Sequence, residues 1–214
     1  MLDVLCAGQA VLDCITRGKE ADPYRENVYR AKDIRLRPGG DAVNEAKALA
    51  GMRLRTAICC GLGEDIAGRI IADDLEKAGV DISRISRLDS DTPVANIMVA
   101  EDGSRFSVNS EATSLPGYRI DPDQLTGAKV VSFASLFRPP LADAGNLREL
   151  FGAAKESGSI ICVDTKLPLT EGIRLEVYKE ILPLIDYFFP NENEAAYYSG
   201  QDEFAAMAEI FLDY

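Results

Sequence analysis

Short apolar runs of strand character alternate along this chain with longer stretches that have the spacing of amphipathic helices. The strand-like runs cover residues 4–7, 56–60, 130–134, 160–163 and 187–189, and helical stretches cover residues 42–50, 66–78 and 147–155. Strands that alternate with helices build a parallel sheet, because each crossover helix returns the chain to the same end of the sheet. The pattern therefore predicts an α/β fold with a parallel sheet flanked by helices.

Two segments depart from this alternation. Residues 92–100 and 105–109 are β-prone runs, and the Asp102-Gly103 pair between them is typical of a hairpin turn. Residues 16–37 are rich in charge and contain short alternating runs, one of them around Val28-Tyr29. We expect these segments to form a small sheet over one edge of the main one. No linker divides the chain, so residues 1–214 are expected to form one domain.

The charge balance limits the partners of the protein. The chain has 35 acidic and 23 basic residues and a formal net charge of -12. Such a field repels phosphodiester backbones and anionic lipid. No apolar stretch approaches the length needed to span a bilayer, and no basic region precedes the first apolar run. We expect a cytoplasmic protein that binds neither nucleic acid nor membrane.

The chain contains no histidine. This excludes Ser-His-Asp and Cys-His nucleophile systems, HExxH zinc sites and most imidazole acid-base schemes. Any chemistry must use carboxylates, lysine, backbone amides or a bound cation. The five cysteines form no C-x-x-C pair, and we expect them to be free thiols, mostly buried.

The most specific local motif runs Pro38-Gly39-Gly40-Asp41-Ala42-Val43-Asn44, a turn that opens directly into a helix. Paired glycines let a ligand approach the backbone, the helix start supplies free N–H groups, and Asn44 adds an amide one turn later. A polyhydroxylated molecule suits such a site. The alternative is a plain turn in which Asp41 serves as the N-cap.

A carboxylate follows the first strand-like run. Asp13 is expected at the carboxyl edge of the sheet, where open α/β sheets bind ligands. An ionised Asp13 can accept hydrogen bonds from two hydroxyl groups. The alternative is a solvated acid in a loop.

A further candidate site lies late in the chain, where Pro190 separates a strand-like run from a helical one. Asn191 and Glu194 are three residues apart and face one side of the helix, so an amide and a carboxylate could order a hydrated magnesium ion. The same pattern is equally typical of a helix cap.

The segment Gly61-Leu62-Gly63-Glu64-Asp65-Ile66-Ala67-Gly68 is close to two phosphate-binding motifs and fits neither. Ile66 stands where a dinucleotide fingerprint requires glycine. Arg69-Ile70 stand where a P-loop requires Lys and Ser or Thr. A nicotinamide-dependent oxidoreductase that uses this segment remains a minor alternative.

Taken in order, these motifs resemble the ribokinase-like (PfkB) carbohydrate kinase family. The resemblance corresponds to the N-terminal two thirds of such enzymes and implies a Rossmann-like α/β domain with a β-sheet lid, built from about residues 14–37 and 92–109. It implies transfer of the ATP γ-phosphoryl group to a sugar hydroxyl with Mg2+. It also implies a homodimer formed through the lid.

The resemblance assigns roles to particular residues. It implies that the sugar is held by Asp13, Gly39, Gly40, Asn44 and Asn109, and that phosphate and magnesium are organised by Asn191, Glu194 and Lys166. Lys166 stands in a segment where many relatives have asparagine and arginine, so it is either a phosphate contact or a surface lysine. No residue is implied as a direct metal ligand.

The family also carries a Gly-Ala-Gly-Asp element whose aspartate deprotonates the hydroxyl, and no such element occurs up to Tyr214. The resemblance therefore places the catalytic aspartate beyond Tyr214, leaves the domain incomplete at its C-terminus, and implies that these 214 residues alone bind sugar without turning it over. The alternative is a non-catalytic sugar-binding or regulatory module. The acceptor remains open among fructose, ribose, a keto-deoxy sugar acid and a nucleoside.

Overall fold

The core of the protein is a five-stranded parallel sheet. The computed structural model describes residues 1–18, 30–168 and 175–214. The strand order is β11-β10-β9-β1-β4. The strands are β1 (Leu2–Gly8), β4 (Thr56–Cys59), β9 (Ala128–Leu136), β10 (Ile160–Thr165) and β11 (Tyr187–Phe189). This confirms the α/β fold class that the alternation of apolar runs predicted.

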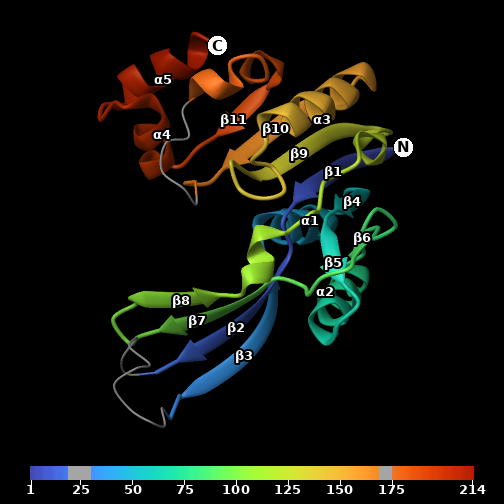
Figure 1. Ribbon diagram of the computed structural model, residues 1–214, viewed down its shortest axis with the longest axis vertical. Coiled ribbons are helices and arrows are strands. Elements are labelled where there is room, and N and C mark those ends of the chain that lie inside the picture. Colours follow the sequence, from blue (N-terminus) through green and yellow to red (C-terminus); the bar gives the residue numbers. More distant parts are fainter. Residues whose placement is uncertain (19–29, 169–174) are drawn as a thin grey trace.

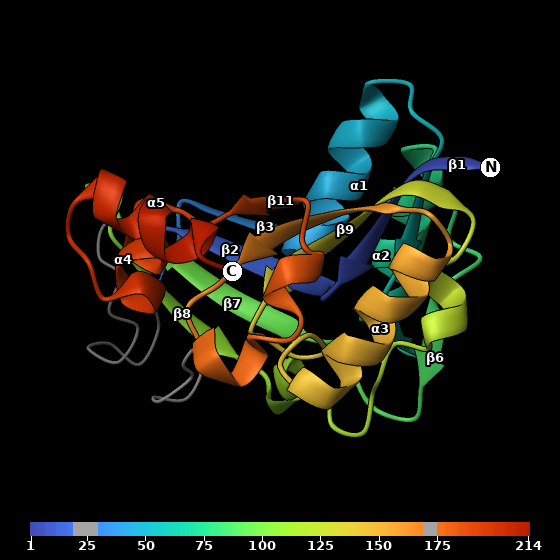
Figure 2. The same ribbon diagram turned by 90° about the horizontal axis from the view of Figure 1, so that it is seen from above.

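Helices cover both faces of this sheet, as Figure 2 shows for α1 and α3. Side chains alternate across a strand, so Leu5 and Ala7 of β1 pack on the side of α3 while Val4 and Cys6 pack on the side of α1 and α2. The helices are α1 (Asp41–Gly51), α2 (Ile66–Lys77), α3 (Ala144–Glu156), α4 (Glu192–Ser199) and α5 (Phe204–Leu212). Short 3-10 turns are η1 (Glu111–Ser114), η2 (Pro122–Leu125), η3 (Leu175–Tyr178) and η4 (Leu182–Leu184).

A second sheet projects from one end of this body (Figure 1). Its order is β3-β2-β7-β8. The strands are β2 (Val11–Arg17), β3 (Asp33–Gly39), β7 (Val94–Val99) and β8 (Arg105–Asn109). The hairpin predicted at Asp102-Gly103 is present as the antiparallel pair β7 and β8. β2 pairs with β7 in parallel, so the sheet is mixed. The run expected around Val28-Tyr29 lies outside the described residues.

Two further strands, β5 (Gly61–Gly63) and β6 (Ser86–Leu88), form a small parallel pair. All five cysteines are free, and Cys6, Cys59 and Cys60 are buried. Within the described ranges, none of the helices combines the length and the hydropathy needed to cross a bilayer.

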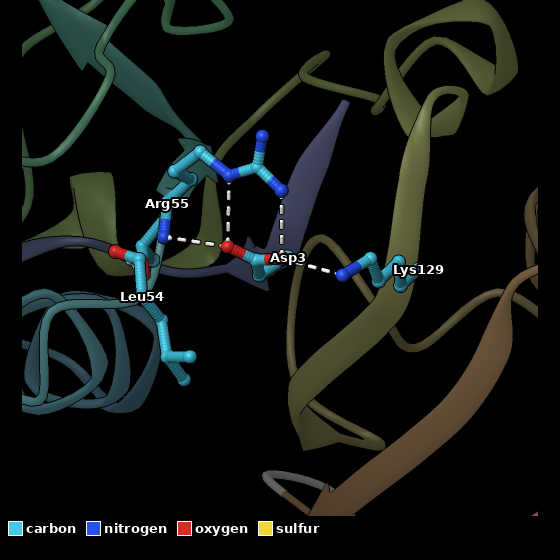
Figure 3. A network of polar contacts seen from close by, with 5 residues as sticks. Asp3, Leu54, Arg55 and Lys129 are labelled. Carbon is cyan, nitrogen blue, oxygen red and sulfur yellow. Dashed lines mark hydrogen bonds and ion pairs between the residues drawn. The ribbon is translucent and has the colours of Figure 1, made fainter.

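An ion-pair network joins the amino ends of the three adjacent strands β9, β1 and β4 (Figure 3). Asp3 of β1 accepts hydrogen bonds from the Arg55 guanidinium at 2.9 and 3.0 Å and from Lys129 of β9 at 2.9 Å. The hydrogen bonds from Arg55 and Lys129 hold the pKa of Asp3 well below its usual range. The network aligns β1, β4 and β9 from the end opposite to the candidate site.

Candidate functional site

The register of the second sheet places the predicted residues Asp13 and Asn109 in one row, with Ala95 between them. Asp13 of β2 is opposite Ala95 of β7, and Ala95 is opposite Asn109 of β8. Residues directly opposite each other share a face of the sheet. All three line a hollow of about 160 Å3 at the junction with the main body. Its other walls include Gln9, Gly40, Thr113 and Arg138.

The two glycines of the turn lie against this row. A Cβ at Gly39 would be 2.2 Å from Oδ2 of Asp13. At Gly40, φ is +89°, and a Cβ would be 2.4 Å from the carbonyl oxygen of Gln9. Both positions therefore require glycine, the first to leave room for the Asp13 carboxylate and the second for backbone conformation and close packing.

Helix α1, which follows the turn, is not capped by Asp41, so the alternative in which Asp41 serves as the N-cap is wrong. Gly40 is the N-cap residue of α1, and no side chain caps it. The Asp41 side chain instead accepts hydrogen bonds from the Ser135 hydroxyl and from Nζ of Lys166, at 3.0 Å for the lysine. Asn44 lies one turn into α1, where its side chain is exposed and its N–H donates to the Gly40 carbonyl at 3.0 Å.

Asp13 lies in a strand, so the solvated loop acid considered above is wrong. Its side chain is half-buried. Burial, with the negative charge of Asp41 nearby, raises the pKa of Asp13. A half-buried carboxylate gains most from a ligand that donates hydrogen bonds.

A second carboxylate lies at the end of β10. The backbone N–H of Ser135 donates to Oδ2 of Asp164 at 3.3 Å. Burial, with the charge of Asp41 second, raises the pKa of Asp164 to about 6. The carboxyl ends of β9 and β10 and the start of α1 thus bring together several acids that are distant in sequence.

Lys166 is tied to this group of acids. Its Nζ contacts Asp41, 125 positions away in sequence, although the side chain is about half exposed. Its carbonyl oxygen accepts a hydrogen bond from the Tyr198 hydroxyl at 2.6 Å. Lys166 is therefore held near the candidate site, and its role as a phosphate contact stays a prediction.

Asn191 and Glu194 form a capping box at the start of α4. The Asn191 side chain accepts from the Glu194 N–H at 3.0 Å, and the Glu194 carboxylate accepts from the Asn191 N–H at 3.0 Å. Glu194 is buried and also accepts from the Thr165 hydroxyl at 2.8 Å. The cap considered above is present, and a role for this pair in organising magnesium stays a prediction.

Residues 61–68, the segment close to two phosphate-binding motifs, form hydrogen bonds within the protein. The Asp65 carboxylate caps α2 by accepting from the Gly68 N–H at 2.7 Å, and it also accepts from the Thr92 N–H at 2.7 Å and the Thr92 hydroxyl at 2.8 Å. The Gly63 N–H donates to the same hydroxyl at 2.9 Å. These amides are therefore not available to a pyrophosphate, which disfavours the oxidoreductase alternative.

Sequence reasoning missed several residues of the hollow. Gln9 donates from Nε2 to the Thr113 carbonyl at 2.5 Å and so joins two distant walls. Arg138 follows β9, the strand that ends beside the acids. A conspicuous local signal was available, because Ser135-Leu136-Phe137-Arg138-Pro139-Pro140 places a basic residue and two prolines directly after a buried strand.

The parallel sheet, its helices on both faces and the second sheet define a ribokinase-like fold. Arabidopsis thaliana ribokinase, solved in complex with ribose and ATP, superposes with a TM-score of 0.76 at 21% identity, over 99% of this chain and 68% of that one. The 2-dehydro-3-deoxygluconokinase of Thermotoga maritima superposes with a TM-score of 0.76 at 21% identity, over 100% of this chain and 68% of that one.

Sequence comparison makes the assignment more specific. The family model for pfkB family carbohydrate kinases matches residues 1–211, and the chain belongs to this family. The ATP-dependent ribose-1-phosphate kinase of Halopiger xanaduensis is 27% identical over 216 residues, which cover 100% of this chain and 69% of that protein. The resemblance inferred from the motifs is confirmed.

Proposed function

We propose that the protein binds a sugar in the hollow lined by Asp13, Gly40 and Asn109 and serves in the transfer of the ATP γ-phosphoryl group to one of its hydroxyls. The observation that carries this proposal is the convergence on one hollow of residues from the turn and from two strands of the second sheet. At about 160 Å3 the hollow is smaller than the roughly 300–1,000 Å3 typical of drug-sized ligands. That size favours a monosaccharide over a nucleoside.

Each residue has a role that its chemistry supports. The Asp13 carboxylate accepts hydrogen bonds from two neighbouring hydroxyls, and Asn109 supplies one amide donor pair and one acceptor. Gly40 lines the hollow, Gly39 leaves room for the Asp13 carboxylate, and Asn44 offers a second amide from α1. The second sheet then acts as a lid that covers the sugar and excludes water during transfer.

The carboxyl edge of the main sheet suits an ATP–Mg2+ complex. No cluster of three or more His, Cys, Asp or Glu side chains that could hold a metal directly occurs in the described part of the chain. Mg2+ usually keeps several waters and binds through phosphate oxygens and one or two carboxylates, so an indirect site fits these residues. We assign Lys166, Asn191 and Glu194 to this region, and Mg2+ would neutralise charge on the transferred group.

We further propose a homodimer formed through the lid. Ile34 and Leu36 of β3 and Phe106 and Val108 of β8 share the face opposite Asp13, and between 41% and 64% of each residue is exposed. Apolar side chains gathered on one sheet face favour an interface. Light scattering after size exclusion should give twice the chain mass, and Leu36→Lys should give the monomer. A monomeric wild type would contradict this proposal.

We place the reaction in the cytoplasm, where ATP is abundant. Five free cysteines suit a reducing compartment.

The test of the proposed function is an ATP-consumption screen of the full-length protein against neutral sugars, sugar phosphates, sugar acids and nucleosides, with calorimetry on the same panel. Binding with turnover supports the kinase. Binding of sugar without turnover favours the alternative, a non-catalytic sugar-binding module. Absence of both binding and turnover for every compound would overturn the assignment of the hollow.

A further inference from the structure

Arg138 is fixed in the wall of the hollow by an unusual backbone. Ser135 and Phe137, which precede it, have φ values of 67° and 73° although neither is glycine. The Phe137 ring is fully buried against Tyr178 and Tyr198, with ring centroids 4.7 and 4.5 Å away. Left-handed conformations at such residues persist only when the surrounding packing enforces them, and they cluster at functional sites. The packing therefore fixes the position of the Arg138 backbone.

The guanidinium of Arg138 is not paired with a carboxylate. Its Nε donates to the Leu167 carbonyl oxygen, and the described residues provide no other hydrogen-bond or ion-pair partner for it. Burial lowers its pKa, while Tyr198, Asp41 and Glu194 oppose this shift without a direct hydrogen bond to it. Lys166 differs, because Asp41 neutralises it at 3.0 Å. A half-buried cation with no paired carboxylate is costly, and an anionic ligand would offset that cost.

The hollow therefore has two chemically different walls. Asp13 and Asn109 come from the second sheet and suit hydroxyl groups, whereas Arg138 comes from the end of β9 and suits an anion. A guanidinium presents a planar fork of N–H donors that matches a carboxylate or a phosphate in two-point contact. A ligand that satisfies both walls has hydroxyls at one end and a negative group at the other.

We propose that Arg138 determines specificity by binding a negatively charged substituent of the sugar, so that the substrate class is an anionic sugar, either a sugar phosphate or a sugar acid. This inference rests on the proposed function of the hollow. It selects among the acceptors that the family membership leaves open. If Arg138 served only to hold Leu167 in place, the protein would not prefer anionic over neutral sugars.

The test compares neutral and anionic members of matched sets in calorimetry and in ATP consumption. Ribose, ribose 1-phosphate and ribonate form one set, and glucose, glucose 1-phosphate and gluconate form another. The wild type should bind the best anionic member at least about 10-fold more tightly than its neutral counterpart. The phosphate and the acid within each set show which anion the site takes.

Variants assign the selectivity to Arg138. Arg138→Gln should lower the affinity for the preferred anionic sugar by about 10-fold or more, with neutral sugars changed less than about twofold, and Arg138→Lys should recover part of the loss. Arg148→Gln is the matched control, because Arg148 pairs with Glu180 on the exposed surface of α3. Circular dichroism verifies that each variant is folded.

Four results would overturn the inference while leaving the proposed function intact. Neutral sugars could bind as tightly as anionic ones, Arg138→Gln could weaken both classes equally, or it could raise the KM for ATP alone. Loss of the selectivity in Arg37→Gln with Arg138→Gln unaffected would transfer the role to Arg37, which lies in register with Asp13, and would also overturn it. No binding of any sugar would overturn both the inference and the proposed function.

Discussion

At the scale of single residues, the site concentrates carboxylates at the cost of stability. Asp13, Glu45 and Asp164 all have a raised pKa, with burial as the largest cause in each case. Burial removes these carboxylates from water, and the charge of Asp41 repels each of them. Residues that destabilise the folded state in this way are typical of binding sites, since a ligand supplies the hydrogen bonds that the protein does not.

The pH dependence of stability should reveal Asp164. Its folded-state pKa of about 6 exceeds the ordinary 3.8, so its contribution to stability is fully present below pH 3.8 and is lost as the pH rises through 6. Asp164→Asn should therefore raise the free energy of unfolding at pH 8 by about 1–2 kcal/mol, after a discount for solvent exposure. Urea titrations at pH 4 and pH 8 measure this difference.

Asp73→Asn is the control for that experiment, because Asp73 is exposed on α2. It should leave the stability nearly unchanged at both pH values. An Asp164→Asn protein that gains nothing at pH 8 over pH 4 would show that Asp164 is not strained by its surroundings.

Residue identity alone predicted part of the site. Asp13, Gly39 and Gly40 stand out because a carboxylate and paired glycines beside a strand suit a ligand site, and the structure brings Asp13 and Gly40 to one hollow. Asp41 could not be placed in the same way, since its contacts with Ser135 and Lys166 join residues that are far apart in sequence. The contact from Lys166 to Asp41 spans 125 positions, and nothing in the local pattern of either residue indicates it.

At the scale of elements, the turn between β3 and α1 lies against the hollow, because Gly40 lines it and Gly39 leaves room for the Asp13 carboxylate. Gly39→Ala should displace the Asp13 carboxylate and lower sugar affinity by about 10-fold or more, with little change in fold. Gly40→Ala should lower the free energy of unfolding by about 1–3 kcal/mol, because φ is +89° and the added Cβ meets the Gln9 carbonyl. Calorimetry and denaturant titration measure the two effects.

Gly51→Ala provides the matched glycine control. Gly51 ends α1, and a Cβ there would meet nothing within 4 Å. The free energy of unfolding of the Gly51→Ala protein should stay the same or rise by up to about 1 kcal/mol. Equal effects of all three substitutions would contradict the assignment of special roles to Gly39 and Gly40.

The capping box of α4 allows its structural and its proposed ligand roles to be separated. Glu194→Ala removes the acceptor for the Asn191 N–H and the Thr165 hydroxyl, and should cost about 2–3 kcal/mol of stability. Asn191→Ser keeps a capping oxygen and should change stability by less than about 0.5 kcal/mol. Thermal denaturation measures both.

The same variants test the phosphate and magnesium role. If Asn191 helps to organise the ATP–Mg2+ complex, Asn191→Ser should weaken binding of that complex while the protein remains as stable as the wild type. Unchanged binding of the complex would leave Asn191 as a helix cap only.

Elements were predictable where the pattern is local. The alternation of strand-like and helical runs predicted the parallel strands. Asp102-Gly103 indicated the hairpin, because the type of a turn depends on adjacent residues. The parallel pairing of β2 with β7 was not predicted, since it joins segments some 80 residues apart. That pairing sets the register that brings Asp13, Ala95 and Asn109 into one row.

At the scale of the whole molecule, the site lies between two sheets that differ in how extensively other elements pack against them. The main sheet is packed by helices on both faces, whereas the second sheet carries β8, whose five residues are all exposed. A sheet with so little packing deforms at low cost, and closure over a ligand requires such an element. Asp13, Gly39 and Asn109, three of the residues proposed to hold the sugar, lie on that less supported sheet.

The central claim is that Asp13 holds a sugar in the hollow between the two sheets. Calorimetry with the best sugar of the panel should show that Asp13→Asn lowers affinity by about 100-fold, because the amide accepts fewer hydroxyl hydrogen bonds and carries no charge. Asp73→Asn should bind like the wild type. Equal affinity of the wild type and Asp13→Asn for that sugar would contradict the account.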